Sequence, residues 1–186
     1  MSILGLRIAE LMATEKPWDA DAETAFGIGR TLADAYGFEP PLQMMRISEA
    51  ADIWRTRFVD EPRLDAVAEI DAELALALLD TAVESGAPTA LRRLQVALNA
   101  LGGRSGRWPE LDATGWPGAM TLYALRQCIE IHGDGVRPVL LGLLVTQRAT
   151  EALLDGVDGD AVTAPPLAWA RLAAIAGAPH GHNGAR

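Results

Sequence analysis

Four carboxylates crowd one short segment near the N-terminus. They are Glu15, Asp19, Asp21 and Glu23. They directly follow an apolar stretch, and Trp18 and Phe26 stand among them. Aromatic surface disfavours the charged form of a carboxyl group, so that it can hold a proton for a leaving oxygen. With a second carboxylate to activate water, this is the chemistry of glycoside hydrolysis, although acidic loop residues are also common as plain solvated surface.

Tryptophan supplies a second hint of a sugar ligand. The chain has 5 Trp, 2 Tyr and 3 Phe, so half of its aromatic residues are Trp, and Trp18, Trp108 and Trp116 fall in predicted loops. Flat apolar rings of this kind stack on sugar rings. The alternative is that loop tryptophans cap the hydrophobic core.

Other reaction classes find no support in the residue spacing. The chain has neither a His-Glu-x-x-His zinc helix nor a Gly-x-Ser-x-Gly elbow. The pair Gly27 and Gly29 starts like a dinucleotide fingerprint, but Leu32 replaces the third glycine. The aspartates at 155, 158 and 160 have the wrong spacing for a calcium loop, and His180 and His182 lie in a polar tail. We therefore expect no metal and no cofactor.

The composition of the chain excludes some classes of binding partner. The net charge of −9 repels phosphate backbones, which argues against a nucleic-acid ligand. No apolar run approaches the length of a membrane span, so we expect no membrane insertion, and the N-terminus lacks the pattern of a secretory signal. Cys128, the single cysteine, excludes an internal disulfide, and its apolar neighbours predict a buried core residue.

Helical periodicity dominates the elements that must position these residues. The spacing of Val67, Ile70, Leu74 and Leu78 predicts one helix that runs to residue 85 and ends at Gly86. Further helices are expected over residues 3–12, 48–58, 88–101, 117–133 and about 140–156, with a short one at 167–176. The helices on either side of Gly86 should form a central antiparallel hairpin. The fold class predicted is therefore all-α and compact.

The order of motifs resembles the phage-type N-acetylmuramidases of glycoside hydrolase family 108, with their C-terminal predicted peptidoglycan-binding half. The segment 79–86, LDTAVESG, is similar to the family's Phe-Asp-x-x-Val-Asn-Ser-Gly. Leu94-Gln95 followed by Gly115, Gly118 and Thr121 keeps the spacing of its later motif. The resemblance extends over roughly residues 3–154.

The N-terminal part matches less closely. Glu15-Lys16-Pro17-Trp18 stands where the family has Glu-Gly-Gly-Tyr, and residues 23–28, ETAFGI, resemble its Glu-Thr-x-aromatic-Gly-Ile. The resemblance implies that Glu15 is the catalytic acid. Lys16 and Pro17 replace the glycine pair, so a cation stands next to this acid in sequence.

The resemblance implies a lysozyme-like helical domain. Residues 1–72 would form a muramidase-like catalytic half, residues 73–160 a peptidoglycan-binding-like half, and residues 161–186 a C-terminal helix and flexible tail. Glu15 would act as general acid on the β-1,4 glycan bond, with Asp19, Asp21 or Glu23 as base and Trp18, Phe26, Trp108 and Trp116 as substrate-binding residues. The first alternative is a catalytically inactive peptidoglycan-binding or particle-associated structural protein, and the second is a protein–protein adaptor with no glycan affinity. A holin or a secretion apparatus would deliver the protein from the cytoplasm to the periplasm and cell wall.

Overall fold

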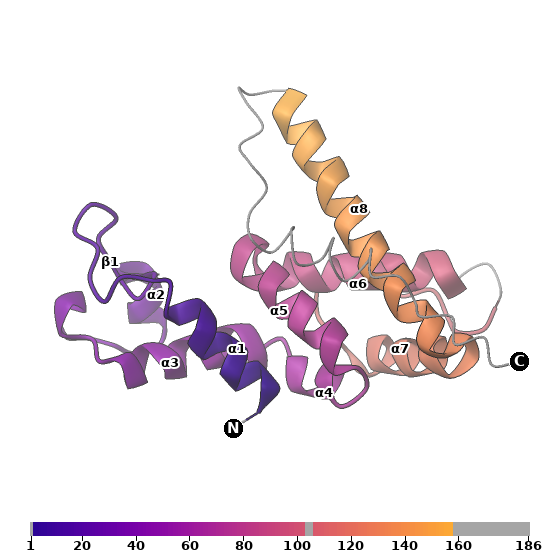
Figure 1. The fold of residues 1–186 in the computed structure, drawn as a ribbon, viewed down its shortest axis with the longest axis horizontal. Helices are drawn as coiled ribbons and strands as arrows, with labels where there is room; N and C mark the ends of the chain where they lie inside the picture. Colours follow the sequence, from indigo (N-terminus) through magenta and orange to yellow (C-terminus); the bar gives the residue numbers. More distant parts are fainter. Residues whose placement is uncertain (1, 103–105, 158–186) are drawn as a thin grey trace, which may run out of the picture. The chain divides into compact units, whose positions relative to one another are not determined.

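The structure, a computed structural model, describes residues 2–102 and 106–157. The predicted helix at 167–176, the two histidines of the tail and the whole predicted segment 161–186 lie outside the described residues. Within the described residues the fold is helical apart from one small hairpin, as predicted (Figure 1). The chain divides into two compact units, residues 1–79 and 80–186. The predicted boundary between residues 72 and 73 stays a prediction.

The first unit begins with α1 (Ile3–Met12), whose bounds agree with the sequence prediction. The Ser2 side chain caps this helix by accepting a hydrogen bond from the amide of Gly5 at 3.1 Å. Its buried residues Leu4, Ile8 and Met12 repeat every four residues, which places them on one face. That face packs against α3 (Ile47–Arg55).

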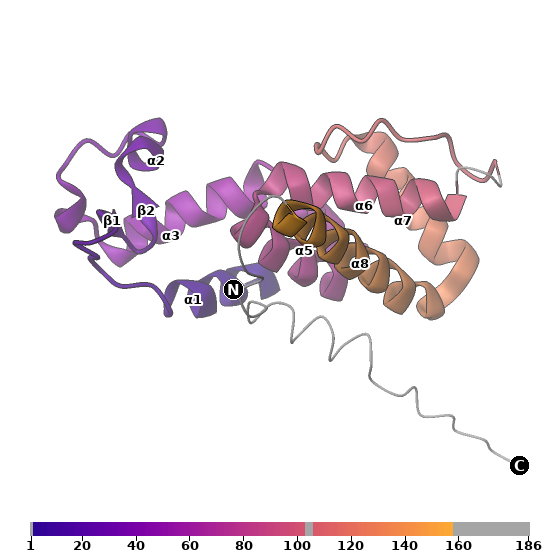
Figure 2. The same ribbon diagram turned by 90° about the horizontal axis from the view of Figure 1, so that it is seen from above.

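Between α1 and α3 lie short elements. The strands β1 (Thr24–Ala25) and β2 (Ile28–Gly29) form an antiparallel hairpin, and α2 (Arg30–Ala35) follows β2 directly. Figure 2 shows the hairpin beside α2. The 3₁₀ turn η1 (Leu42–Met44) contacts β1. The first unit is completed by the π-helical turn η2 (Thr56–Asp60) and by α4 (Leu64–Ala68).

The helix predicted around Val67 is interrupted in the structure. Helix α4 ends at Ala68, and α5 (Ala72–Ser85) begins anew. The side chain of Asp71 explains the break, because its Oδ1 accepts a hydrogen bond from the amide of Leu74 at 2.9 Å and so caps the new helix. The end of α5 is as predicted, since Gly86 follows Ser85 with a left-handed φ of 87°.

The second unit is built from long helices. They are α6 (Ala87–Gly102), α7 (Ala119–His132) and α8 (Val136–Val157), with the 3₁₀ turn η3 (Gly133–Gly135) between the last two. Helix α6 packs against both α7 and α8, so the expected hairpin of α5 and α6 is not the main packing of this unit. Cys128 is buried in α7, as predicted.

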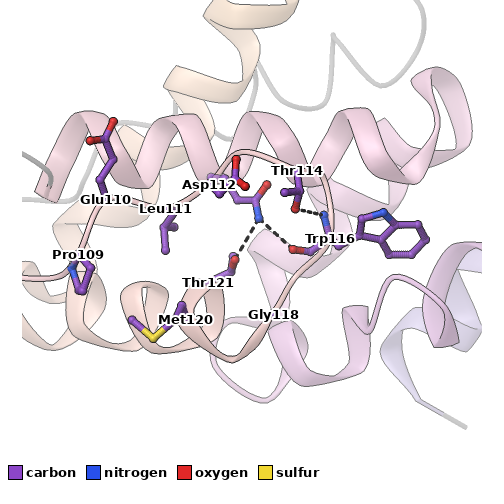
Figure 3. Close-up of a pocket in the computed structure, with 10 residues that line it drawn as sticks. Pro109, Glu110, Leu111, Asp112, Thr114, Trp116, Gly118, Met120 and Thr121 are labelled. Carbon is purple, nitrogen blue, oxygen red and sulfur yellow. Dashed lines mark hydrogen bonds between the residues drawn. The ribbon is translucent and has the colours of Figure 1, made fainter.

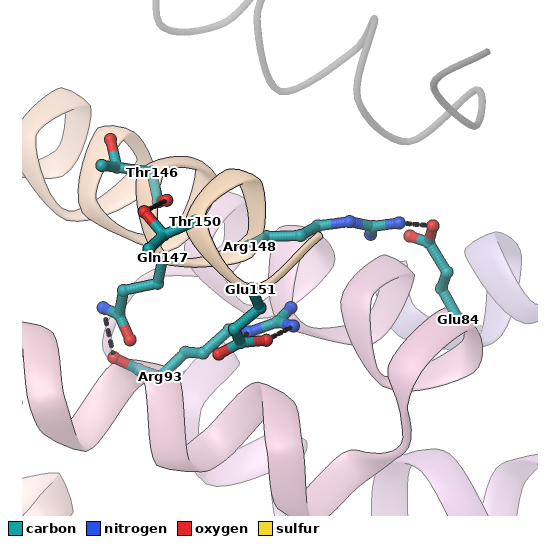
Figure 4. Close-up of polar contacts among 7 residues, drawn as sticks. All are labelled: Glu84, Arg93, Thr146, Gln147, Arg148, Thr150 and Glu151. Atoms are coloured by element: carbon teal, nitrogen blue, oxygen red, sulfur yellow. Dashed lines mark hydrogen bonds and ion pairs between the residues drawn. The ribbon is translucent and has the colours of Figure 1, made fainter. Parts of the chain in front are cut away.

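Polar contacts also fasten α8 to the second unit (Figure 4). The buried guanidinium of Arg93 in α6 forms an ion pair with Glu151. Gln147, one turn before Glu151, donates a hydrogen bond to the backbone carbonyl of Arg93 at 3.1 Å. Arg148 forms an ion pair with Glu84 at the end of α5. Helix α8 therefore has a fixed rotation about its axis, because these three side chains must all face their partners.

Candidate active site

Glu15 lies in the turn that ends α1. The amide of Thr14 donates to the carbonyl of Leu11 at 3.1 Å, and the amide of Glu15 donates to the carbonyl of Met12 at 3.0 Å. These bonds continue the helix by one irregular turn and anchor the backbone of Glu15 to a helix that has one buried face. Its side chain is exposed.

The chain after Glu15 runs back alongside the hairpin. Phe26 donates its amide to the carbonyl of Lys16 at 2.9 Å, while Asp19 and Thr24 exchange two backbone hydrogen bonds of 2.8 and 3.1 Å. Residues 16–19 therefore lie as an irregular extension along the edge of the two-stranded sheet, on the β1 side. This arrangement holds the segment of acidic residues next to the turn of the hairpin.

The turn of the hairpin brings Gly27 next to Glu15, the candidate acid. Its two central residues, Phe26 and Gly27, have φ values of 50° and 74°, which is the pattern of a type I′ hairpin turn. A Cβ atom built on Gly27 would lie 3.1 Å from both Cδ and Oε2 of Glu15. The carboxylate of Glu15 thus lies beside the side of Gly27 that carries no side chain, and a Cβ there would push it aside by a few tenths of an ångström.

The lysine next to Glu15 does not hold this carboxylate. Lys16 directs its Nζ to Oδ2 of Asp19, at 2.7 Å. Within residues 2–102 and 106–157, no hydrogen bond or ion pair engages the side chain of Glu15. The carboxylate is therefore free to meet a ligand, and the cation that sequence reasoning placed beside it is neutralised by Asp19.

Asp19 is instead committed to the loop. Besides the ion pair with Lys16, its Oδ1 accepts hydrogen bonds from the amides of Asp21 and Ala22, at 3.1 and 3.3 Å. The hydrogen bond from Lys16, followed by those from the backbone, lowers the pKa of Asp19 below its ordinary value of 3.8. Asp19 is consequently ionised, and its carboxylate oxygens are bound by Lys16 and by the two backbone amides. Asp21 and Glu23 are exposed, and Glu23 adopts a left-handed φ of 52°.

The aromatic residues named from the sequence differ in their exposure. Trp18 is partly exposed and Trp116 is 56% exposed, so both are accessible to a ligand. Phe26 and Trp108 are buried, with 8% and 2% exposed. The side chain of Trp108 packs so closely on Gly102, the last residue of α6, that a Cβ there would lie 1.9 Å from its ring.

Sequence reasoning missed two residues that shape the site. Gly27 drew attention only within a failed dinucleotide motif and within the ETAFGI match, and neither pattern indicates a hairpin turn beside Glu15. Trp54 lies in the helix predicted over residues 48–58, where a tryptophan indicates a core or interface residue. Its indole Nε1 in fact donates to the carbonyl of Phe26 at 3.1 Å, across 28 residues of chain, and no local pattern could have indicated that contact.

A separate pocket of about 270 Å³ lies in the second unit (Figure 3). The loop between α6 and α7 supplies most of its lining, together with the first turn of α7. Pro109, Leu111 and Met120 are its apolar residues, and Glu110 and Asp112 bring carboxylates. Trp116 stands at the opposite end from Pro109, with its indole directed outward.

Two side-chain amides of α6 hold this loop. Gln95, which is 2% exposed, donates to the carbonyl of Trp116 and to Oγ1 of Thr121, and accepts from the amide of Gly115 at 2.9 Å. One turn further along, Asn99 exchanges two hydrogen bonds of 2.8 Å with the backbone of Leu111. The Gln95, Gly115 and Thr121 spacing noticed in the sequence is thus the spacing of one buried hydrogen-bonding cluster.

Neither a metal-binding cluster nor a membrane-spanning helix occurs in residues 2–102 and 106–157. Among these residues, no group of three or more His, Cys, Asp or Glu side chains is arranged to bind a metal ion. No described helix combines the length and apolar character that crossing a membrane requires.

Comparison with known proteins bears on the first unit. Residues 9–86 match the family model described as glycosyl hydrolase 108. The resemblance expected from the sequence is thereby confirmed over these residues, which include Glu15 and the hairpin, and the match supports a glycoside hydrolase. The resemblance of the C-terminal half to a peptidoglycan-binding domain stays a prediction.

The fold has solved counterparts. The structure of SagA from Brucella abortus aligns with a TM-score of 0.59 at 18% sequence identity, covering 92% of this chain and 94% of that chain. At this identity the likeness concerns the fold alone. No curated protein matches the chain significantly.

Proposed function

We propose that the chain is a peptidoglycan hydrolase of the N-acetylmuramidase type, in which Glu15 donates the proton to the bridging glycosidic oxygen. The observation that carries the proposal is the placement of Glu15. Its exposed carboxylate has no partner in the described part of the chain and rests on Gly27, inside the segment that matches a glycoside hydrolase family. A general acid needs this freedom to reach the leaving oxygen.

The second carboxylate is assigned within the acidic loop. Asp19 is held by Lys16 and by two backbone amides, which occupy most of the lone pairs that a base would use to bind water. Asp21 and Glu23 are the better candidates because both are exposed. Which one acts, and whether the reaction inverts or retains the anomeric configuration, depends on its separation from the acid.

A glutamine substitution tests the acid. Glu15→Gln preserves the shape of the side chain and removes only its titratable proton, so we expect loss of activity without loss of stability. Activity is measured as the decrease in turbidity of purified cell walls. Glu39→Gln, the same change at another exposed glutamate of the first unit, is the matched control and should lyse walls at the parental rate. Parental lysis by Glu15→Gln would reject Glu15 as the acid.

Product analysis tests the type of bond. A muramidase leaves N-acetylmuramic acid at the new reducing end, and reduction with borohydride followed by mass spectrometry identifies that sugar. N-acetylglucosamine at the new reducing end would agree with a glycoside hydrolase but would overturn the assignment as a muramidase.

The second candidate function is wall binding without catalysis. The pocket of the second unit favours it, because the loop around that pocket is fixed by Gln95 and Asn99 and presents an exposed Trp116. Sugar rings stack on such an indole. Co-sedimentation with insoluble peptidoglycan, for the parent and for Trp116→Ala, distinguishes a binder from a protein that only cleaves. In either function we propose that the protein acts in the cell wall after delivery by a holin or secretion apparatus.

A further inference from the structure

Trp54 makes one directional contact that hydrophobic packing does not require. It lies in the last turn of α3 and is 6% exposed, and its Nε1 donates to the carbonyl of Phe26 at 3.1 Å. The ring is held by Phe58, whose centroid lies 5.2 Å away at an interplanar angle of 59°. The indole N–H is therefore aimed from a rigid helix at a single backbone carbonyl in the hairpin turn.

The turn needs such an anchor. Phe26 has a φ of 50°, a left-handed conformation that is unfavourable for any residue other than glycine. Each strand of the hairpin has only two residues, and a two-stranded hairpin has little stability of its own. Both backbone polar groups of Phe26 are bound, the amide by the carbonyl of Lys16 and the carbonyl by Trp54. These two bonds fix the plane of the turn.

Glu15 is connected to this turn on two sides. Through the backbone, Lys16 follows Glu15 and accepts the hydrogen bond from Phe26. Through space, Gly27 follows Phe26, and a Cβ built on Gly27 would lie 3.1 Å from Cδ of Glu15, so the two residues are neighbours. A displacement of the Phe26 backbone would therefore move both supports of Glu15.

We infer that Trp54 is a positioning residue for the reaction, holding the Phe26–Gly27 turn and through it the carboxylate of Glu15. The inference rests on the proposed function of Glu15. It assigns to the N–H of Trp54 a role that is separate from the burial of its ring, and the two roles predict different results when only the N–H is removed.

Two variants remove the donor. Trp54→Phe deletes the indole N–H along with part of the ring. The second variant replaces Trp54 by benzothienylalanine, in which sulfur replaces the N–H in a ring of nearly the same shape. It keeps the packing and is used if Trp54→Phe folds poorly. Phe38→Leu is the control, because Phe38 is a buried aromatic of the same unit whose ring faces the guanidinium of Arg30, 5.9 Å from the ring centroid.

The kinetic readout separates positioning from stability. For cleavage of soluble glycan fragments, we expect loss of the donor to lower kcat by about ten- to a hundredfold, as a displaced catalytic group does, with KM changed by less than about twofold. Phe38→Leu should lower Tm while leaving kcat per folded molecule at the parental value. Parental kcat in both donor-free variants, or an equal loss of kcat in Phe38→Leu, would overturn the inference.

A second readout needs no activity. Amide hydrogen exchange of Phe26, measured by NMR, should accelerate at least about tenfold in the donor-free variants because the turn loses one of its two anchors, while amides of α1 keep their protection. An unchanged exchange rate at Phe26 would overturn the inference even if the parent cleaved no glycan. Conversely, an inactive parent with accelerated exchange would reject the proposed function and leave the anchoring of the turn supported.

Discussion

The contact between Glu15 and Gly27 predicts the effect of adding one methyl group. In Gly27→Ala, the new Cβ would lie 3.1 Å from Cδ and Oε2 of Glu15, closer than ordinary van der Waals contact. These atoms are the end of a flexible side chain, so the carboxyl group moves aside at little cost. The remaining cost is backbone strain at a φ of 74°, about 1 to 2 kcal/mol for a residue with a Cβ.

Gly37→Ala separates the two effects. Gly37 has a φ of 75°, and a Cβ built there meets nothing within 4 Å. Both variants should therefore lose the same free energy of unfolding, about 1 to 2 kcal/mol, in urea titrations. Only Gly27→Ala should also lose wall-lysis activity, by about ten- to a hundredfold, because only there is the carboxylate displaced. Parental lysis by Gly27→Ala, or an equal loss in Gly37→Ala, would refute the reasoning.

Three further predictions concern stability and titration. Gln95→Leu should lower the free energy of unfolding by about 2 to 4 kcal/mol, since it leaves buried polar groups of the α6–α7 loop without partners, and a smaller shift of the urea midpoint would contradict the role of this amide. Burial raises the pKa of the Cys128 thiol, so at pH 8 a disulfide reagent should react with it far more slowly in the native protein than in urea, and equal rates would show that it is accessible. In Lys16→Gln, the pKa of Asp19 should rise toward 3.8 in an NMR titration. Because the pKa of Asp19 is lowered in the folded state, the ion pair contributes to stability above pH 3.8, and this contribution is lost as the pH falls through the pKa of the folded state. An unchanged pKa of Asp19 in Lys16→Gln would show that the ion pair is not formed.

Local sequence signals predicted much of the helical fold. The bounds of α1 follow from apolar residues on one face, and the end of α5 follows from Gly86, because both depend on residues within a few positions of each other. The break at residues 69–71 was not predicted, since Ile70 continues the apolar period while the cap supplied by Asp71 overrides it. Periodicity alone cannot decide between these competing local preferences.

The candidate site was predictable only in part, because several of its contacts depend on how the chain folds. The acidic loop and Glu15 could be named from composition and from the family motif. The partner of Lys16 could not, because sequence adjacency suggested Glu15 and the folded loop brings Asp19 to the ammonium. Contacts between distant segments, such as Trp54 with Phe26, are set by how α3 packs and leave no trace in the local pattern.

The paired amides of α6 restrict how this chain can change in length. Gln95 and Asn99 are one helical turn apart, and they bind Leu111 and Gly115, which are also four residues apart. An insertion or deletion between residues 111 and 115 would put the two attachments out of step, whereas one in the preceding part of the loop, at residues 106–110, would keep them aligned. Natural variants and grafted peptides should therefore vary in length before Leu111 and keep a constant length after it.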